Sequence, residues 1–405
     1  MGQGGSALVG ALEIGVTSRF SRARTLLAIL FGVLIACALL AGCDLGSPNE
    51  QLPVGSDGSA DNGGDDAQVP DGSGQGDTAA SGPKIAAGAE GGEGPRRSLL
   101  AELEGFGGNT TGGLAGDEYV VTNLRDDGAG SLRAGAEASG ARWITFADGL
   151  AGTIGLDGDI SVRGDKTIDG RGADITVDGG GLRVVGDNVI ISHLRFVNTP
   201  DDAVSFYEGR RDGWVHHSTF VGRGDGRQDG AIDIGGRSTD ITVSWNLFDG
   251  WDKTSLATWA RFNGEPFSGS VEKVRVTYHH NYFKESRQRQ PLVRTALLHS
   301  YNNLFERYGA DGTGVAIEAC NLAEVLSENN LFDDAHGRRA IKTAQESAAC
   351  SAPGLAKSVG DIMGGDATRE IRDPQSVFDA GRYYDYRLDK ATDALRQELR
   401  STAGA

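Results

Sequence analysis

The sequence predicts an all-β chain wound as a right-handed, single-stranded parallel β-helix. The main observation is a degenerate repeat, in which a β-branched run is followed by a polar residue and then an aromatic residue. Successive repeats end at aromatic residues spaced by 24, 28, 35, 22 and 27 positions, namely Phe196, Phe220, Phe248, Phe283, Phe305 and Phe332. A period in the twenties with variable insertions is typical of a solenoid, whose rungs bury their apolar faces only by stacking.

The individual elements follow from the same repeat. Strands are expected at the apolar runs, near residues 189–196, 214–220, 241–248, 274–283, 298–305 and 325–332. Alternation along a strand directs Val, Ile and Phe inward, and Asn residues at the turns can hydrogen-bond from rung to rung. The first amphipathic helix is expected at 391–399. A β-sandwich is the alternative fold, but its regular, closely spaced hairpin turns are lacking.

Residues 1–43 are expected to be an export signal. Arg19, Arg22 and Arg24 precede an uncharged run that ends in Leu-Ala-Gly-Cys at 40–43, which resembles a bacterial lipobox. The run is short for a membrane span, so Cys43 is expected to be lipidated, with an uncleaved anchor helix as the alternative. The protein is therefore predicted to be exported, and either lipid-anchored to the cell envelope or secreted.

Residues 44–104 are expected to form a disordered tether that precedes a β-helix domain at 105–405. The tether is rich in Gly, Ser and Asp and carries 12 acidic against 3 basic residues, so it cannot bury enough apolar surface to offset its ordering entropy. The formal charge of the whole chain is −17, which argues against a nucleic-acid partner. In an exported domain Cys320 and Cys350 are expected to form a disulfide, with two buried free thiols as the alternative.

Charged side chains in the middle of the sequence predict a metal-assisted site for an anionic polymer. Arg289 and Arg294 flank a proline and form a preorganised pair of cations, while Asp229, Asp233 and Lys253 lie upstream. Taken singly, each could be an ordinary surface charge or salt bridge. On a straight strand Asp229 and Asp233 would be roughly 13 Å apart, so a turn has to intervene at the Asp-Gly dipeptide.

A third carboxylate joins this set from the preceding rung. Asp202 lies 27 residues before Asp229, and stacking at about 4.8 Å is expected to bring the two together. Clustered carboxylates without Cys or His suit a hard cation such as calcium. Asp201 is the alternative to Asp202, because the two are adjacent. The ligands are expected on an outward face, so that calcium matters more for activity than for folding.

With these motifs the chain resembles the pectate lyases of polysaccharide lyase family 1. The resemblance covers most of the predicted domain, from the segments 105–108, 121–126, 130–133 and 166–172 to Phe332. The early segments are structural in that family and are expected to mark the capped start of the β-helix. The later segments carry the chemistry.

The resemblance implies a role for each candidate residue. Calcium would be held by Asp202, Asp229 and Asp233. The substrate carboxylate would be bound by Lys253 and Arg294. Arg289 would be the Brønsted base, and His299 is the next candidate for that role because it is close in sequence.

The resemblance further implies a monomeric, calcium-dependent lyase that cleaves polygalacturonate by β-elimination into unsaturated oligogalacturonides. A pectin lyase acting on methyl-esterified pectin is the first alternative, but it would lack the calcium aspartates. A non-catalytic polysaccharide-binding β-helix of the cell envelope is the second, but it would lose the cations. Both sets of residues are present.

Three motifs depart from the family's pattern. His216 replaces the acid of the usual Trp-Ile-Asp-His motif, Trp251 replaces the usual His before the Asp-Lys pair, and Thr295-Ala296 replaces the usual Phe-Gly. These changes remove no catalytic group, but they are expected to reshape the substrate subsites.

Overall fold

The computed structural model describes residues 94–224, 228–258, 272–309, 314–333, 339–343, 350–371 and 377–405. All of them belong to one compact unit, residues 77–405. The predicted export signal, Cys43 and most of the predicted tether lie outside the described residues. Within these ranges, no helix is long and apolar enough to cross a membrane.

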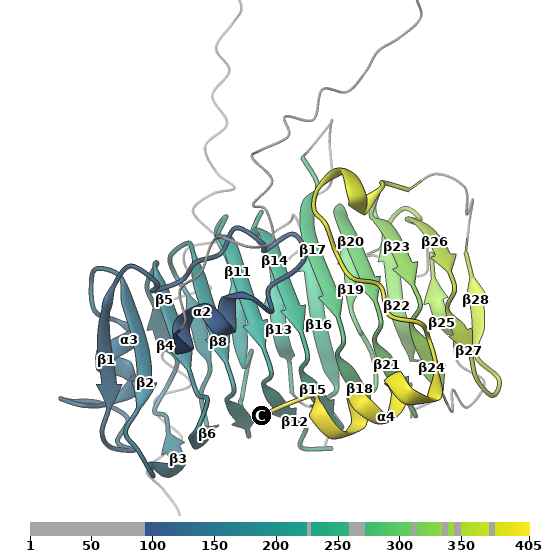
Figure 1. The fold of residues 1–405 in the computed structure, drawn as a ribbon. Coiled ribbons are helices and arrows are strands. Elements are labelled where there is room, and N and C mark those ends of the chain that lie inside the picture. Colours follow the sequence, from purple (N-terminus) through teal and green to yellow (C-terminus); the bar gives the residue numbers. More distant parts are fainter. Residues whose placement is uncertain are drawn as a thin grey trace, which may run out of the picture. The chain divides into compact units, whose positions relative to one another are not determined.

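The described residues form three parallel sheets that together make a β-helix (Figure 1). Sheet A has ten strands: β1 (Asp117–Val121), β2 (Arg142–Phe146), β5 (Lys166–Asp169), β8 (Val189–Ser192), β11 (Arg211–His216), β14 (Thr239–Ser244), β17 (Val274–His279), β20 (Ala296–Tyr301), β23 (Glu324–Glu328) and β26 (Leu355–Val359). Sheet B has nine: β3 (Ala151–Gly155), β6 (Asp174–Asp178), β9 (Arg195–Val197), β12 (Thr219–Val221), β15 (Leu247–Asp249), β18 (Tyr282–Lys284), β21 (Leu304–Glu306), β24 (Leu331–Asp333) and β27 (Ile362–Met363). Sheet C also has nine: β4 (Ile160–Val162), β7 (Leu182–Val184), β10 (Val204–Phe206), β13 (Gly230–Ile234), β16 (Lys253–Thr258), β19 (Leu292–Arg294), β22 (Val315–Cys320), β25 (Arg339–Lys342) and β28 (Thr368–Glu370).

The predicted fold class is confirmed, and the β-sandwich alternative is wrong. Each strand pairs in parallel with the equivalent strand of the next rung, as between β14, β17 and β20. The described helices are α2 (Pro95–Leu100), α3 (Leu132–Ala136), the 3₁₀ helix η1 (Ala380–Arg382) and α4 (Asp393–Thr402).

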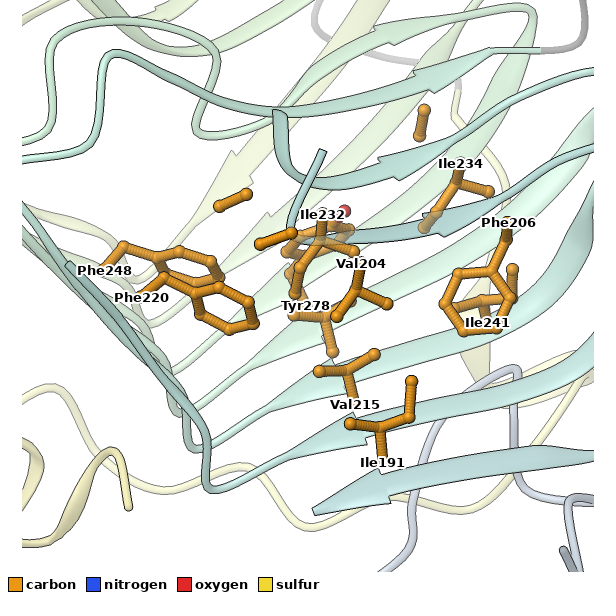
Figure 2. Close-up of a cluster of buried hydrophobic side chains, with 14 of the residues drawn as sticks. Ile191, Val204, Phe206, Val215, Phe220, Ile232, Ile234, Ile241, Phe248 and Tyr278 are labelled. Atoms are coloured by element: carbon orange, nitrogen blue, oxygen red, sulfur yellow. The ribbon is translucent and has the colours of Figure 1, made fainter. Parts of the chain in front are cut away.

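The repeat seen in the sequence becomes two ladders. The predicted aromatic residues stack face to face along sheet B, for example Phe220 on Phe248 with ring centroids 5.1 Å apart, and Figure 2 shows this pair packed in the core. The predicted asparagine ladder is also present: the Asn281 side chain donates to Asn303, and Asn303 donates to Asn330. Stacking of the rungs therefore buries the apolar side chains and gives the buried asparagine side chains hydrogen-bond partners.

The turns between sheets A and B share one backbone conformation. The first residue of each two-residue turn has a positive φ angle, as do His217 (42°), Trp245 (57°) and His280 (53°). Because these residues occupy equivalent positions on successive rungs, their rings stack on one another, with 5.6 Å between His217 and Trp245 and 4.5 Å between Trp245 and His280.

The N-terminal boundary of the folded domain lies earlier than predicted. Residues 94–104, assigned to the tether from composition, include helix α2, and Leu99 is fully buried in a cluster with Trp143 and Trp214 on sheet A. The expectation that segment 105–108 marks the capped start of the β-helix is also wrong. Its Gly107 N–H donates to Thr242 Oγ1 on β14 at 3.0 Å, so the segment crosses the middle of sheet A.

The C-terminal helix occurs close to the predicted position. Helix α4 begins after Thr392, whose side chain accepts a hydrogen bond from the Leu395 N–H, and it buries Leu395 and Leu399. These leucines pack against residues of sheet B and its turns, where Figure 1 shows α4 lying beside β15, β18 and β21.

Cys320 and Cys350 form a disulfide, with 5.4 Å between their Cα atoms. The two cysteines pack with Leu256 and Leu292 in a small apolar cluster. Both leucines belong to sheet C, on the strands that follow Asp233 in register. The disulfide therefore supports the part of sheet C that holds the candidate site.

Candidate active site

Strand register on sheet C decides which predicted carboxylates meet. Strand β10 pairs with β13 so that Val204 lies opposite Ile232, an offset of 28 residues. Gly230 rather than Asp229 therefore follows Asp202 on the next rung, and the Asp202 Oδ1 atom accepts a hydrogen bond from the Gly230 N–H at 2.9 Å. The expectation that Asp202 stacks on Asp229 is wrong by one residue, because this rung is longer than the 27 residues assumed.

The carboxylates of Asp202 and Asp233 converge over Gly230. A Cβ atom at Gly230 would lie 2.4 Å from Asp233 Oδ1 and 2.7 Å from Asp202 Oδ1. Only glycine leaves space for both oxygens here. Asp233 is 3% exposed and its Oδ1 accepts a hydrogen bond from the Leu256 N–H at 2.9 Å. Asp233 alternates along β13 with Ile232 and Ile234, which belong to the core, so its side chain points away from the core as predicted, although neighbouring groups bury it.

The two carboxyl groups carry poorly compensated negative charge. Burial raises the pKa of Asp202 to about 6, although a hydrogen bond from the Tyr207 hydroxyl at 2.6 Å opposes the rise. Burial, followed by repulsion from Asp202, raises the pKa of Asp233 well above its ordinary value. Such a pair is stabilised by a bound cation, which would favour the ionised form of both groups.

Asp229 lies beside this pair, but its carboxylate has another partner. Lys253 Nζ is 3.2 Å from Asp229 Oδ1, and the two side chains are 33% and 43% exposed. The Trp251 indole N–H donates to the Asp229 carbonyl oxygen at 2.6 Å. Among the described residues, the three predicted aspartates do not form a group whose ligand atoms all lie within 4.8 Å of one another. The fold brings them to neighbouring rungs, with only Asp202 and Asp233 in direct apposition.

Arg289 and Arg294 lie on one rung, just before β19 and at its last residue, and this rung follows that of β16 on sheet C. They flank a cis Gln290–Pro291 peptide bond, and the Arg289 carbonyl oxygen accepts a hydrogen bond from the Ser255 N–H at 2.8 Å. The charge of Arg289 acts on buried Asp233, so the cations and the carboxylates belong to one electrostatic cluster. This hydrogen bond fixes the backbone of Arg289, and with it the point from which the Arg289 side chain extends.

Arg294 has unused hydrogen-bonding capacity. Burial, followed by the charge of Arg289, lowers the pKa of Arg294. Its Nε atom is buried and has no hydrogen-bond acceptor among the residues that the structure describes. A guanidinium group with an unsatisfied donor is suited to an anionic ligand such as a carboxylate. The site can therefore bind a cation and an anion side by side.

Comparison with known proteins agrees with this geometry. A family model described as pectate lyase matches residues 100–372. A pectate trisaccharide-lyase of Thermotoga sp. (strain RQ2) is 33% identical over 318 residues, which cover 70% of this chain and 81% of that protein. The chain belongs to the pectate lyase family. A probable pectate lyase of Solanum lycopersicum is 31% identical over 260 residues, and the match covers 56% of this chain but only 61% of that relative.

Solved structures of other proteins, among them a pectate lyase, share the fold. The major allergen of cedar pollen, jun a 1, superposes with a TM-score of 0.61 at 24% identity, covering 76% of this chain and 94% of that chain. A pectate lyase from Bacillus sp. N165, solved with trigalacturonate, superposes with a TM-score of 0.55 at 21% identity and covers 75% of this chain and 98% of that chain.

Pectate lyases generally use calcium, and the residues of this site fit such an ion. The candidate donors are carboxylate oxygens, which calcium prefers. Asp202 and Asp233 would hold the ion, because Gly230 leaves them the space to converge and because their charge is otherwise poorly compensated. The negative charges of Asp201 and Asp229 contribute to the raised pKa of Asp202. These two aspartates are therefore the candidates for completing the ligand set.

Sequence reasoning missed three residues of this pectate lyase site, namely Tyr207, Glu318 and Lys342. Tyr207 orients the Asp202 carboxylate. Glu318 lies opposite Leu292 in register, acts on the charge of Arg294, and is 3.5 Å from Lys342 Nζ. No motif marks these residues, and only the register between rungs reveals that they lie beside the predicted ones.

The structure also locates the departures from the family's pattern. Trp251 contacts the site through Asp229, whereas His216 lies on sheet A beneath Glu102. His299 is wrong as an alternative base: it is fully buried on sheet A, and its ring nitrogens contact Tyr384 and Glu328 at 2.7 and 2.9 Å.

Proposed function

We propose that this protein is a calcium-dependent lyase that cleaves de-esterified pectin, polygalacturonate, by β-elimination to give unsaturated oligogalacturonides. The observation that supports this most strongly is the convergence of Asp202 and Asp233 over Gly230, beside Arg289 and Arg294. A carboxylate pair and an arginine pair within one electrostatic cluster supply the complementary charges that a metal ion and a uronate need.

The chemistry assigns a task to each side chain. β-Elimination removes the proton α to the uronate carboxylate, forms a carbon–carbon double bond and expels the glycosidic oxygen. Lys253 and Arg294 bind the carboxylate and reduce its negative charge, which makes the α proton more acidic. Calcium, when bound at Asp202 and Asp233, supplies further positive charge of the same kind. Arg289 in its neutral form accepts the proton from the α carbon and becomes the guanidinium cation, and solvent water protonates the departing glycosidic oxygen.

The activity is tested on purified protein with polygalacturonate as substrate. We expect the ultraviolet absorbance of unsaturated uronide to increase, and we expect excess chelator to abolish the increase. Calcium added back should restore it. Faster turnover of highly methyl-esterified pectin, insensitive to chelator, would instead indicate a pectin lyase. Absence of unsaturated product from either polymer would contradict a lyase and leave polysaccharide binding alone.

We also propose that the protein is exported as a monomer and anchored through lipidated Cys43. The sequence supports this by the three arginines, the short apolar run and the lipobox-like segment that end at Cys43. Replacing Cys43→Ser removes the acceptor thiol, so most of the protein should move from the membrane fraction to the soluble fraction. Fractionation followed by immunoblotting measures the change. Unchanged membrane retention of the variant would exclude the lipid anchor.

A further inference from the structure

A second group of metal-ligating side chains lies on sheet A, apart from the sheet C residues of the candidate lyase site. One ligand atom each from Glu102, His216 and His217 lies within 4.8 Å of the other two, and His216 Nε2 is 3.1 Å from Glu102 Oε2. In a tetrahedral site with bonds of about 2.0–2.1 Å, ligand atoms are roughly 3.3 Å apart. We propose that these three side chains bind a divalent cation of the zinc class.

The fold positions Glu102 without help from a metal. Helix α2 and the residues after it pack on sheet A through Leu99 and Leu103, which belong to a cluster with Trp143 and Trp214. The Glu102 N–H donates to the Leu99 carbonyl oxygen at 3.1 Å. The backbone of Glu102 is therefore fixed, while its side chain remains 50% exposed and free to adjust.

His217 is held as firmly as Glu102. Its ring lies between those of His193 and Trp245, with centroid distances of 4.9 and 5.6 Å. The His217 Nδ1 atom is 3.2 Å from the Gly404 carbonyl oxygen. Because a carbonyl oxygen can only accept, Nδ1 carries the proton and Nε2 of the neutral ring presents a lone pair. A second-sphere contact of this kind is usual for metal-binding histidines.

His216 has a matching second-sphere contact. Its Nδ1 atom is 3.0 Å from Ser244 Oγ, and Ser244 Oγ accepts a hydrogen bond from the Trp214 indole at 2.9 Å. When Nδ1 donates to Ser244, the Nε2 lone pair faces the Glu102 carboxylate across 3.1 Å. Two acceptors at that distance repel each other, and a cation between them converts the repulsion into coordination.

The donor set and its surroundings define the class of ion. Two imidazoles and one carboxylate favour zinc and its neighbours in the first transition row over calcium or magnesium. A cavity of about 450 Å³ reaches Glu102 and His217, so a fourth coordination position is open to water. The ion would link the N-terminal segment, sheet A and, through Gly404, the C-terminus.

The test is a zinc titration of protein without a histidine tag, freed of metal and then kept in excess calcium so that the aspartates of sheet C are occupied. Calorimetry should show one equivalent of zinc bound in the micromolar range or tighter, and zinc should raise the melting temperature by several degrees. Cobalt(II) in place of zinc should give the visible absorption of a four-coordinate site. His216→Gln and His217→Gln should each weaken zinc binding by more than about 100-fold.

The matched control is His280→Gln. His280 lines the same cavity and contacts Asp389 at 3.2 Å, but it lies outside the ligand set, so this variant should bind zinc like the wild type. If a histidine variant fails to fold, the exposed Glu102→Gln replaces it and should also lose affinity. No saturable zinc binding by the wild type, or wild-type binding in His217→Gln or Glu102→Gln, would overturn the proposal.

Discussion

Arg289→Lys should lower kcat on polygalacturonate by roughly 10³-fold, within the range expected for loss of a general base. Lysine keeps the positive charge but loses the planar guanidinium and its reach. The backbone at this position is fixed by the hydrogen bond from the Ser255 N–H to the Arg289 carbonyl oxygen, so the substitution should not move the strand. Turnover is measured by the absorbance of the unsaturated product, and trigalacturonate binding by calorimetry should stay near the wild-type value.

Arg294→Lys is the matched comparison, because it makes the same chemical change five residues away. Arg294 is half-buried and its Nε donor is unsatisfied, so its replacement should weaken trigalacturonate binding as well as the rate. If Arg289→Lys lowers only kcat, while Arg294→Lys lowers both kcat and the affinity for trigalacturonate, the two arginines have different tasks. Near wild-type turnover of Arg289→Lys would require another base.

Asp233→Asn should lower calcium affinity by on the order of 100-fold, because it removes one ligand charge, and activity should fall with it. Asparagine keeps the oxygen that accepts the Leu256 N–H, so packing is preserved. Calorimetric calcium titration measures the affinity. Asp174→Asn is the control, since Asp174 is exposed on sheet B and its replacement makes the same change in net charge. Unchanged calcium affinity in Asp233→Asn would contradict the metal assignment.

The same variant should change the pH dependence of stability in the metal-free protein. A carboxyl group with a raised pKa in the folded state stabilises the fold at pH values below its unfolded pKa, and this contribution is lost as the pH rises through the folded value. For the Asp202 and Asp233 pair the loss begins near pH 4 and passes through the Asp202 pKa of about 6. At pH 7 Asp233→Asn should therefore be as stable as the wild type or more stable. At pH 4 the variant and the wild type should have the same melting temperature. A variant that is less stable than the wild type at pH 7 would contradict the repulsion between Asp202 and Asp233.

The sequence predicts the fold well because the fold repeats. Six successive repeats show the same apolar run, polar residue and phenylalanine, and the stacks of Phe220 on Phe248 and of Asn281 on Asn303 follow directly from that repeat. The prediction fails where a single residue decides the outcome. One extra residue in a rung places Gly230 instead of Asp229 next to Asp202, and spacing alone does not reveal which turn holds the insertion.

Contacts that cross the repeat are also invisible in the sequence pattern. Segment 94–104 looks like the end of a polar tether, yet its apolar side chains dock on sheet A and bring Glu102 to His216, 114 residues away. Tyr207 is equally unmarked, because its role depends on where Asp202 turns its carboxylate. Local periodicity fixes the rungs, whereas tertiary packing selects which side chains on neighbouring rungs meet.

The most direct test of the central claim is a crystal structure of the Arg289→Lys variant with calcium and trigalacturonate, in which slow turnover keeps the substrate intact. The account predicts anomalous density for the metal between the carboxylates of Asp202 and Asp233, with a uronate carboxylate next to Arg294 and Lys253. It also predicts that residue 289 faces the α carbon of that uronate. Trigalacturonate bound elsewhere, or a metal that avoids both aspartates, would contradict the account.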